Sequence, residues 1–195
     1  MAWPNSRVRP SREPTASAKI LVAGGFGVGK TTAIGAVSET EVLSTEALMT
    51  AASDGYDDLS AVPDKTTTTI VMDYGRLTLD HDLRLYLFGA PGQDRFWFLW
   101  DDLARGAIGA LVLVDTRRVA DSFAALNYFD ERADIPYLVA INAFDGHLTH
   151  PPSEVREALD LAPHIPLVII DARENDQVLN ALTHLLDHAM NALSA

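Results

Sequence analysis

Residues 24–32, GGFGVGKTT, are the part of this sequence best suited to binding a polyanion. Gly24, four further residues, Gly29, Lys30 and Thr31 fit the phosphate-binding loop pattern G-x-x-x-x-G-K-[ST]. In such a loop glycines let successive backbone N–H groups turn toward an anion, and the positive end of the next helix adds attraction. We expect Lys30 to contact the β and γ phosphates and the Thr31 hydroxyl to bind Mg²⁺. The expected nucleotide contacts are Gly24, Gly25, Phe26, Gly27, Val28, Gly29, Lys30, Thr31 and Thr32.

A second group of polar residues, in INAFDG at 141–146, has the chemistry to select a base. Asn142 and Asp145 form an N-x-x-D pattern directly after an apolar run. A carboxylate there accepts from both N1–H and the exocyclic amine of guanine, whereas adenine presents an acceptor at that edge. The pattern therefore favours GTP. Ala172, which follows a later apolar run, is placed to offer its backbone N–H to guanine O6.

These residues follow short, nearly continuous apolar runs at 19–23, 109–115, 137–142 and 165–171. Such runs are typical of parallel strands covered by helices on both faces. Residues 69–79 and 83–89 lie too close for a crossover and predict an antiparallel hairpin at one edge. Helices are expected near 30–38, 118–132, 153–161 and 175–192. Together they predict an α/β fold, a doubly wound, mostly parallel six-stranded sheet whose ligand lies beyond the carboxyl ends of the strands. The last helix carries one expected apolar stripe: Val178, Leu179, Leu182, Leu185, Leu186 and Met190.

Composition limits the classes of protein that remain. Residues 1–17 are rich in Pro and Arg without apolar periodicity and predict a disordered tail, so residues 18–195 are expected to form the single nucleotide-binding domain. A net charge of −12 argues against a nucleic-acid partner. With no Cys, and with Ala2 where myristoylation needs Gly, no lipid anchor is expected. Without a signal-like or membrane-spanning stretch, the expected location is the cytoplasm.

At this point the sequence resembles the small Ras-like GTPases over residues 18–190. TIVMDY at 69–74 resembles the end of their switch I, and APGQ at 90–93 resembles their switch II turn. The resemblance implies that Thr69 senses the γ phosphate and closes over Mg²⁺, that Gly92 contacts the γ phosphate, and that Gln93 orients the attacking water.

The sequence resembles the bacterial conservon-type GTPases, relatives of the bacterial cell-polarity GTPases, more closely still. The resemblance lies in AGGFGVGKTT, PDKTTTT, LYLFGAPGQDRFWFLWDDLARGAIGALVLVDTRR and NAFDG. It implies a GTPase switch in bacterial signalling, with a roadblock-fold protein and a sensor-kinase-like protein as candidate partners.

Two positions depart from the widespread GTPase motifs. Gly89 stands where D-x-x-G has the Asp that steadies Mg²⁺ through a water, although the conservon and polarity groups lack this Asp too. Ala143 stands where N-K-x-D has Lys, whose aliphatic stem covers the base. These changes imply an altered metal site and a weaker grip on guanine.

Bulky aromatic residues directly follow the Gly-Gln pair. In this fold the segment moves when the γ phosphate is present, so its aromatic side chains are candidates for a surface that binds a partner, although some of them should belong to the core. These residues are Phe96, Trp97, Phe98 and Trp100. Arg95 is a candidate arginine finger, with an exposed structural arginine as the alternative. Without a finger, intrinsic hydrolysis is expected at about 10⁻⁴ to 10⁻³ per second, faster with a partner.

Two other functions remain open on the sequence alone. One is an ATP-using P-loop protein in which Asp115, at the end of LVLVD, serves as a Walker B carboxylate. The other is a scaffold that binds GTP or GDP without hydrolysing it, for which Gly89 is the main argument.

Overall fold

The computed structural model describes residues 16–50, 67–79, 82–92 and 99–193, with only the backbone of 44–50 and 67–71. The strands are β1 (Ala16–Gly24), β2 (Leu43–Thr50), β3 (Thr67–Leu79), β4 (Leu83–Gly89), β5 (Ala107–Val114), β6 (Tyr137–Asn142) and β7 (Leu167–Ile170). The α-helices are α1 (Lys30–Val37), α2 (Trp100–Ala104), α3 (Phe123–Glu131), α4 (Pro152–Ala158) and α5 (Asn175–Leu193). Two short 3₁₀ turns, η3 (Val119–Ser122) and η4 (Phe144–Gly146), lie in the loops that follow β5 and β6.

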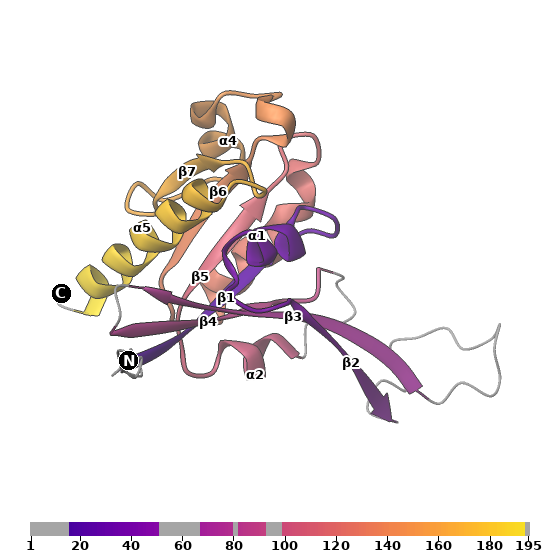
Figure 1. The fold of residues 1–195 in the computed structure, drawn as a ribbon. Coiled ribbons are helices and arrows are strands. Elements are labelled where there is room, and N and C mark those ends of the chain that lie inside the picture. Colours follow the sequence, from indigo (N-terminus) through magenta and orange to yellow (C-terminus); the bar gives the residue numbers. More distant parts are fainter. Residues whose placement is uncertain (1–15, 51–66, 80–81, 93–98, 194–195) are drawn as a thin grey trace, which may run out of the picture.

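The strands form one sheet in the order β2-β3-β4-β1-β5-β6-β7 (Figure 1). Neighbours from β4 to β7 pair in parallel, whereas β2 with β3 and β3 with β4 pair antiparallel. The predicted mostly parallel α/β class and the predicted hairpin are confirmed. The sheet has seven strands rather than six because β2 adds an outer edge. Its sequence, LSTEALMT, has no continuous apolar run and gave no strand signal.

Helices cover both faces of the sheet, and each face has its own apolar core. Residues of α1 and α5 pack with Ile20, Leu111 and Leu138 on one face. Residues of α2, α3 and α4 pack with Leu21, Val112 and Val139 on the other. Adjacent strand residues therefore enter opposite cores, which explains why the central strands are apolar at nearly every position.

Three details differ from the sequence-based expectations. Strand β1 already begins at Ala16, so residues 16–17 are not part of a disordered tail, while residues 1–15 lie outside the described residues. Met190 is 66% exposed and does not belong to the buried stripe of α5. That stripe instead includes the small residues Ala181 and Ala189, which let the helix approach the sheet closely. Within the described part of the chain, no helix combines the length and apolar character that crossing a bilayer requires.

The topology gathers the predicted site at one edge of the sheet. Gly24 at the end of β1 pairs with Leu113 near the end of β5, and Asn142 at the end of β6 pairs with Ile170 at the end of β7. The loops that follow these strands, and the turn after β4, therefore surround the start of α1.

Candidate functional site

The turn from β1 to α1 has the backbone shape of an anion-binding loop. Gly24, Gly27 and Gly29 adopt φ angles of 128°, 70° and 107°, where side chains other than glycine are strained. At Gly29 a Cβ atom would also lie 2.7 Å from Asn142 Nδ2, so glycine is required by space as well as by φ. Helix α1 begins at the next residue, Lys30, and directs its unpaired N–H groups toward the turn.

Lys30 is the cation of this turn. Its Nζ donates hydrogen bonds to the carbonyl oxygens of Gly24, at 2.9 Å, and Gly25, at 2.8 Å. Burial lowers the pKa of Lys30 from 10.5 to about 8, partly opposed by the negative charge of Asp73. A buried ammonium is expensive unless anions accompany it, so the turn favours a polyanionic ligand.

A carboxylate from β3 lies beside the start of α1. The Thr31 hydroxyl donates a hydrogen bond of 2.5 Å to Asp73 Oδ2. Asp73 is buried because residues 73, 75 and 77 of β3 face inward, while 72, 74 and 76 are partly exposed. The Thr31 hydroxyl and the Asp73 carboxylate thus form an oxygen pair of the kind that Mg²⁺ binds together with phosphate oxygens and water. The donor set fits the predicted metal.

Asp73 occupies the space that a side chain at Gly89 would need. A Cβ on Gly89 would lie 3.1 Å from Asp73 Cβ and 3.4 Å from Asp73 Oδ2. Extending the β3–β4 register, in which Tyr74 pairs with Phe88, places Asp73 opposite Gly89. The carboxylate missing from the D-x-x-G position is therefore matched by one on the neighbouring strand.

These groups line a cavity of about 410 Å³. Its walls come from the β1–α1 turn, Thr31, Thr32, Asp73 and the turn after β4. Gly92 closes one side: a Cβ there would lie 2.7 Å from Lys30 Nζ and 2.9 Å from Phe26 N. Gly92 thus lies against the phosphate-binding turn, and its contact with the γ phosphate stays a prediction. Gln93 and Arg95 lie outside the described residues, and of Thr69 the structure describes only the backbone, in β3.

The loop after β6 is joined to the β1–α1 turn by Asn142. Its Nδ2 donates to the carbonyl of Val28 at 2.9 Å, and its Oδ1 accepts from the N–H of Ala172 at 3.0 Å. Asn142 is buried, so it holds three loops in one arrangement. The Ala172 N–H donates to Asn142 in this structure, and its predicted hydrogen bond to guanine O6 stays a prediction. Asp145 has φ 55° and an exposed carboxylate, while Ala143 is buried and offers no stem to cover a base.

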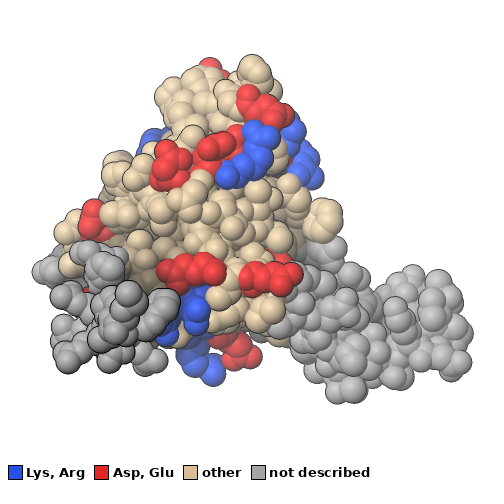
Figure 2. All heavy atoms as spheres, viewed as in Figure 1, with Lys and Arg blue, Asp and Glu red and all other residues tan. Residues whose placement is uncertain are grey.

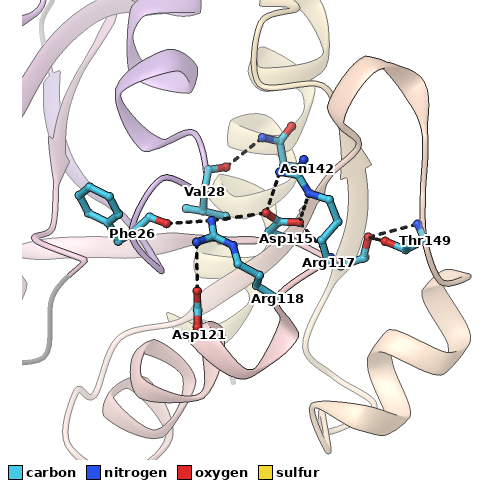
Figure 3. A network of polar contacts seen from close by, with 9 residues as sticks. Phe26, Val28, Asp115, Arg117, Arg118, Asp121, Asn142 and Thr149 are labelled. Carbon is cyan, nitrogen blue, oxygen red and sulfur yellow. Dashed lines mark hydrogen bonds and ion pairs between the residues drawn. The ribbon is translucent and has the colours of Figure 1, made fainter.

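The loop after β5 forms a polar network against the same turn (Figure 3). The Asp115 carboxylate binds the Arg117 guanidinium through hydrogen bonds of 2.9 and 2.8 Å. Arg118 donates to the carbonyl of Phe26 at 3.0 Å and lies near Asp121 and Asp115, at 3.5 and 3.6 Å. Asp115 is therefore engaged with arginines, and Asp73 is the carboxylate that bonds Thr31. This geometry opposes a Walker B role for Asp115.

Trp100 is a core residue rather than part of an exposed aromatic surface. It is 4% exposed, packs edge-on against Tyr128 at 5.1 Å between ring centroids, and contacts Phe129. Its indole N–H donates to the carbonyl of Pro91 at 3.2 Å. Trp100 is thus removed from the residues predicted to meet a partner, because packing buries its ring. Phe96, Trp97 and Phe98 lie outside the described residues.

The fold and the phosphate-binding turn define the chain as a P-loop protein with a GTPase-like fold. Its fold is similar to that of the FeoB iron transporter cytosolic domain of T. maritima in apo form, with a TM-score of 0.62 at 17% identity over 89% of this chain. The alignment spans 64% of that domain. The FeoB G-domain of Methanococcus jannaschii gives a TM-score of 0.59 at 14% identity, over 90% of this chain and 99% of that one.

The family follows from sequence. Residues 22–192 match the family described as "Conserved hypothetical ATP binding protein", and the chain belongs to this family. An uncharacterized protein of Methanocaldococcus jannaschii, MJ1339, is 32% identical over 128 residues, or 65% of this chain and 70% of that protein.

Two features of the site are not indicated by any of the sequence motifs. Asp73 lies within a predicted strand, and the signal that points to it is a carboxylate at an inward position of the alternating pattern. Arg173, which binds Asp145, gave no signal because the partners are 28 residues apart and meet only through the sheet order.

Proposed function

We propose that this chain is a small GTP-binding protein that hydrolyses GTP slowly and acts as a nucleotide-dependent switch. The carrying observation is Asn142, which lies three residues before Asp145. One hydrogen bond links its side chain to Val28 in the phosphate-binding turn, and a second links it to Ala172 in the loop after β7. One rigid connection thereby sets the separation between an anion site and a carboxylate suited to guanine.

The phosphate end of the site is built for charge neutralisation. The backbone N–H groups of residues 25–31 and the Lys30 ammonium would bind the β and γ phosphates, and Gly92 would contact the γ phosphate. Thr31 and Asp73, with Thr69 from β3, would hold Mg²⁺. Bound there, the ion supplies positive charge that stabilises the charge developing on the transferring phosphoryl group.

Hydrolysis should be slow in the chain alone. Gln93 is assigned to orient the attacking water by the resemblance to Ras-like GTPases, and Arg95 is the candidate finger. Arg118 binds the outer carbonyl of Phe26 and lies between two carboxylates, so its charge is already partly neutralised. A rate of about 10⁻⁴ to 10⁻³ per second, raised by a partner, is the expected behaviour.

The base preference is tested by calorimetry with GDP, ADP and XDP on the full chain. The wild type should bind GDP more tightly than ADP. Asp145→Asn should lose GDP affinity and gain XDP affinity, because an amide donor matches the 2-oxo group of xanthine. Asp187→Asn, a charge change on α5, is the control. Equal GDP and ADP affinities in both proteins would contradict guanine specificity.

An ATP-binding protein is the second candidate, favoured by the description of the family to which the chain belongs. Tighter ADP than GDP binding would support it. A non-hydrolysing scaffold is the third, and Asp73 opposes it by providing a carboxylate beside Thr31. Single-turnover release of phosphate from GTP, measured for the wild type and Gln93→Leu, separates a GTPase from a non-hydrolysing scaffold. The scaffold predicts no release above background in either protein.

The cellular role proposed here is bacterial signalling in the cytoplasm, supported by the resemblance to conservon-type GTPases. Candidate partners are a roadblock-fold protein and a sensor-kinase-like protein, contacted through Phe96, Trp97 and Phe98. Binding of each purified partner to the chain loaded with GDP or a non-hydrolysable GTP analogue tests this role. A switch requires affinities that differ between the two loaded forms.

A further inference from the structure

Arg173 joins the loops that follow β6 and β7. Its Nη1 donates to Asp145 Oδ1 at 2.8 Å. Its Nη2 and Nε donate to the two oxygens of Asp171 at 2.6 and 2.9 Å. One guanidinium therefore binds the carboxylate assigned to guanine and a second carboxylate on its own loop. Acidic and basic side chains also lie next to one another on the face seen in Figure 2, toward the end that carries α4.

The Asp171 contact fixes the guanidinium in place. The two parallel hydrogen bonds form a fork, the strongest arginine–carboxylate geometry. Asp171 is 14% exposed, its N–H donates to Gln177 Oε1 at 2.8 Å, and its Oδ1 also accepts from the Arg173 N–H at 3.0 Å. Arg173 holds the pKa of Asp171 down at about 2, so this carboxylate stays charged. An anchored guanidinium loses little further conformational entropy when it also binds Asp145.

The backbone conformation at Asp145 also limits where its carboxylate can lie. Its φ of 55° and the φ of 73° at Gly146 define a tight left-handed turn. The side chain is 77% exposed and directs Oδ1 to Arg173. Guanine offers two donors, N1–H and the 2-amino group, to the two oxygens of a carboxylate. Arg173 already engages one of these oxygens.

We propose that Arg173 sets the purine specificity of the site by occupying one oxygen of Asp145, so that guanine and Arg173 compete for it. This role rests on the proposed guanine specificity. A guanidinium in contact reduces the negative charge that the carboxylate offers and blocks one direction of approach. The 2-amino group of guanine, which would donate to the Asp145 oxygen that Arg173 binds, then adds little affinity.

The test compares GDP with IDP, which lacks only the 2-amino group. Calorimetric dissociation constants are measured on the full chain for the wild type, R173M, D145N and R173M/D145N. Methionine keeps an apolar stem, and any stacking change affects both nucleotides equally. In R173M the preference for GDP over IDP should rise about 3- to 10-fold, the range expected when a charged acceptor is released. In the D145N background R173M should leave the preference unchanged.

Two further variants check the interpretation. R173K should give an intermediate preference, because lysine keeps the charge but cannot form the fork to Asp171. R105M is the matched control, since Arg105 is an exposed arginine paired with Asp102 at 3.4 Å on α2. Circular dichroism confirms that each variant is folded.

The outcomes are distinct. A GDP-to-IDP preference that is unchanged or lower in R173M, in a protein that prefers GDP over ADP, would overturn the role of Arg173 alone. A lower preference would mean that Arg173 supports the base contact. If the wild type does not prefer GDP over ADP and D145N changes nothing, the guanine site falls, and the role of Arg173 with it.

Discussion

At the scale of single residues, the carboxylate proposed to bind Mg²⁺ lies on a different strand from the one that the D-x-x-G motif predicts. The turn after β4 has Gly89, and the neighbouring strand carries Asp73 against Thr31. Coordination of a cation depends on where a carboxylate oxygen lies in space, so a ligand from β3 can take the place of one from the end of β4.

Removing the charge of Asp73 should therefore weaken Mg²⁺-dependent binding. Asp73→Asn is expected to raise the GDP dissociation constant about tenfold with Mg²⁺, because an amide oxygen is a poorer magnesium ligand than a carboxylate. With EDTA in place of Mg²⁺ the difference should vanish. Asp134→Asn, an exposed position, is the control. An Asp73→Asn variant with an unchanged response to Mg²⁺ would exclude this role.

Lys30 gives nucleotide binding a dependence on pH. Its pKa of about 8 in the nucleotide-free protein should rise when a polyanion binds, because the anion favours the charged ammonium. Below about pH 7 Lys30 is already protonated, so affinity should not change. Above about pH 8 binding should take up a proton, and affinity should fall by up to tenfold per pH unit.

Calorimetry of GDP binding in buffers of different ionisation enthalpy measures this proton uptake directly. The wild type should take up about half a proton or more near pH 8.5 and almost none near pH 6.5. Lys30→Arg, which keeps its charge throughout, should show no such rise and accounts for titration of the nucleotide itself. Equal uptake in both proteins would contradict the lowered pKa.

At the scale of elements, Asn142 joins the ends of β1, β6 and β7. Asn142→Ala would leave the buried Val28 carbonyl and Ala172 N–H without this partner. The expected loss is about 2–4 kcal/mol of unfolding free energy, or roughly 5–15 °C in melting temperature. Asn175→Ala removes an exposed hydrogen bond to Ala36 and should cost less than about 1 kcal/mol. Similar losses of unfolding free energy in both variants would show that the Asn142 hydrogen bonds stabilise the fold no more than an exposed hydrogen bond does.

The elements also show how far sequence reasoning extends. The phosphate-binding turn was predictable because its spacing is local, and the parallel strands because burial on both faces leaves continuous apolar runs. Strand β2 was not, since LSTEALMT owes its conformation to pairing with β3. The contacts of Asp73 with Thr31 and of Arg173 with Asp145 depend on register and strand order, which no short motif contains.

At the scale of the whole molecule, the two cores share the strands between them. Leu126 belongs to the core beneath α3 and Leu182 to the core beneath α5, both nearly inaccessible. Because β1, β5 and β6 contribute to both, neither core should melt separately. Leu126→Ala and Leu182→Ala should each lower the free energy of unfolding by about 2–5 kcal/mol, and each should lower the temperature of the single thermal transition. Calorimetry should show a single peak in each variant, and a biphasic melt would contradict shared cooperativity.

The hydrogen bond from Trp100 to Pro91 gives the chain its own optical probe. The other tryptophans are Trp3 and Trp97, so replacing both by Phe leaves Trp100 as the one tryptophan, packed in the core and hydrogen-bonded to Pro91, the residue before Gly92. Loss of that bond would change the polarity around the indole and therefore its emission wavelength. The arrival of a terminal phosphate at Gly92 would then be visible in real time, without a label.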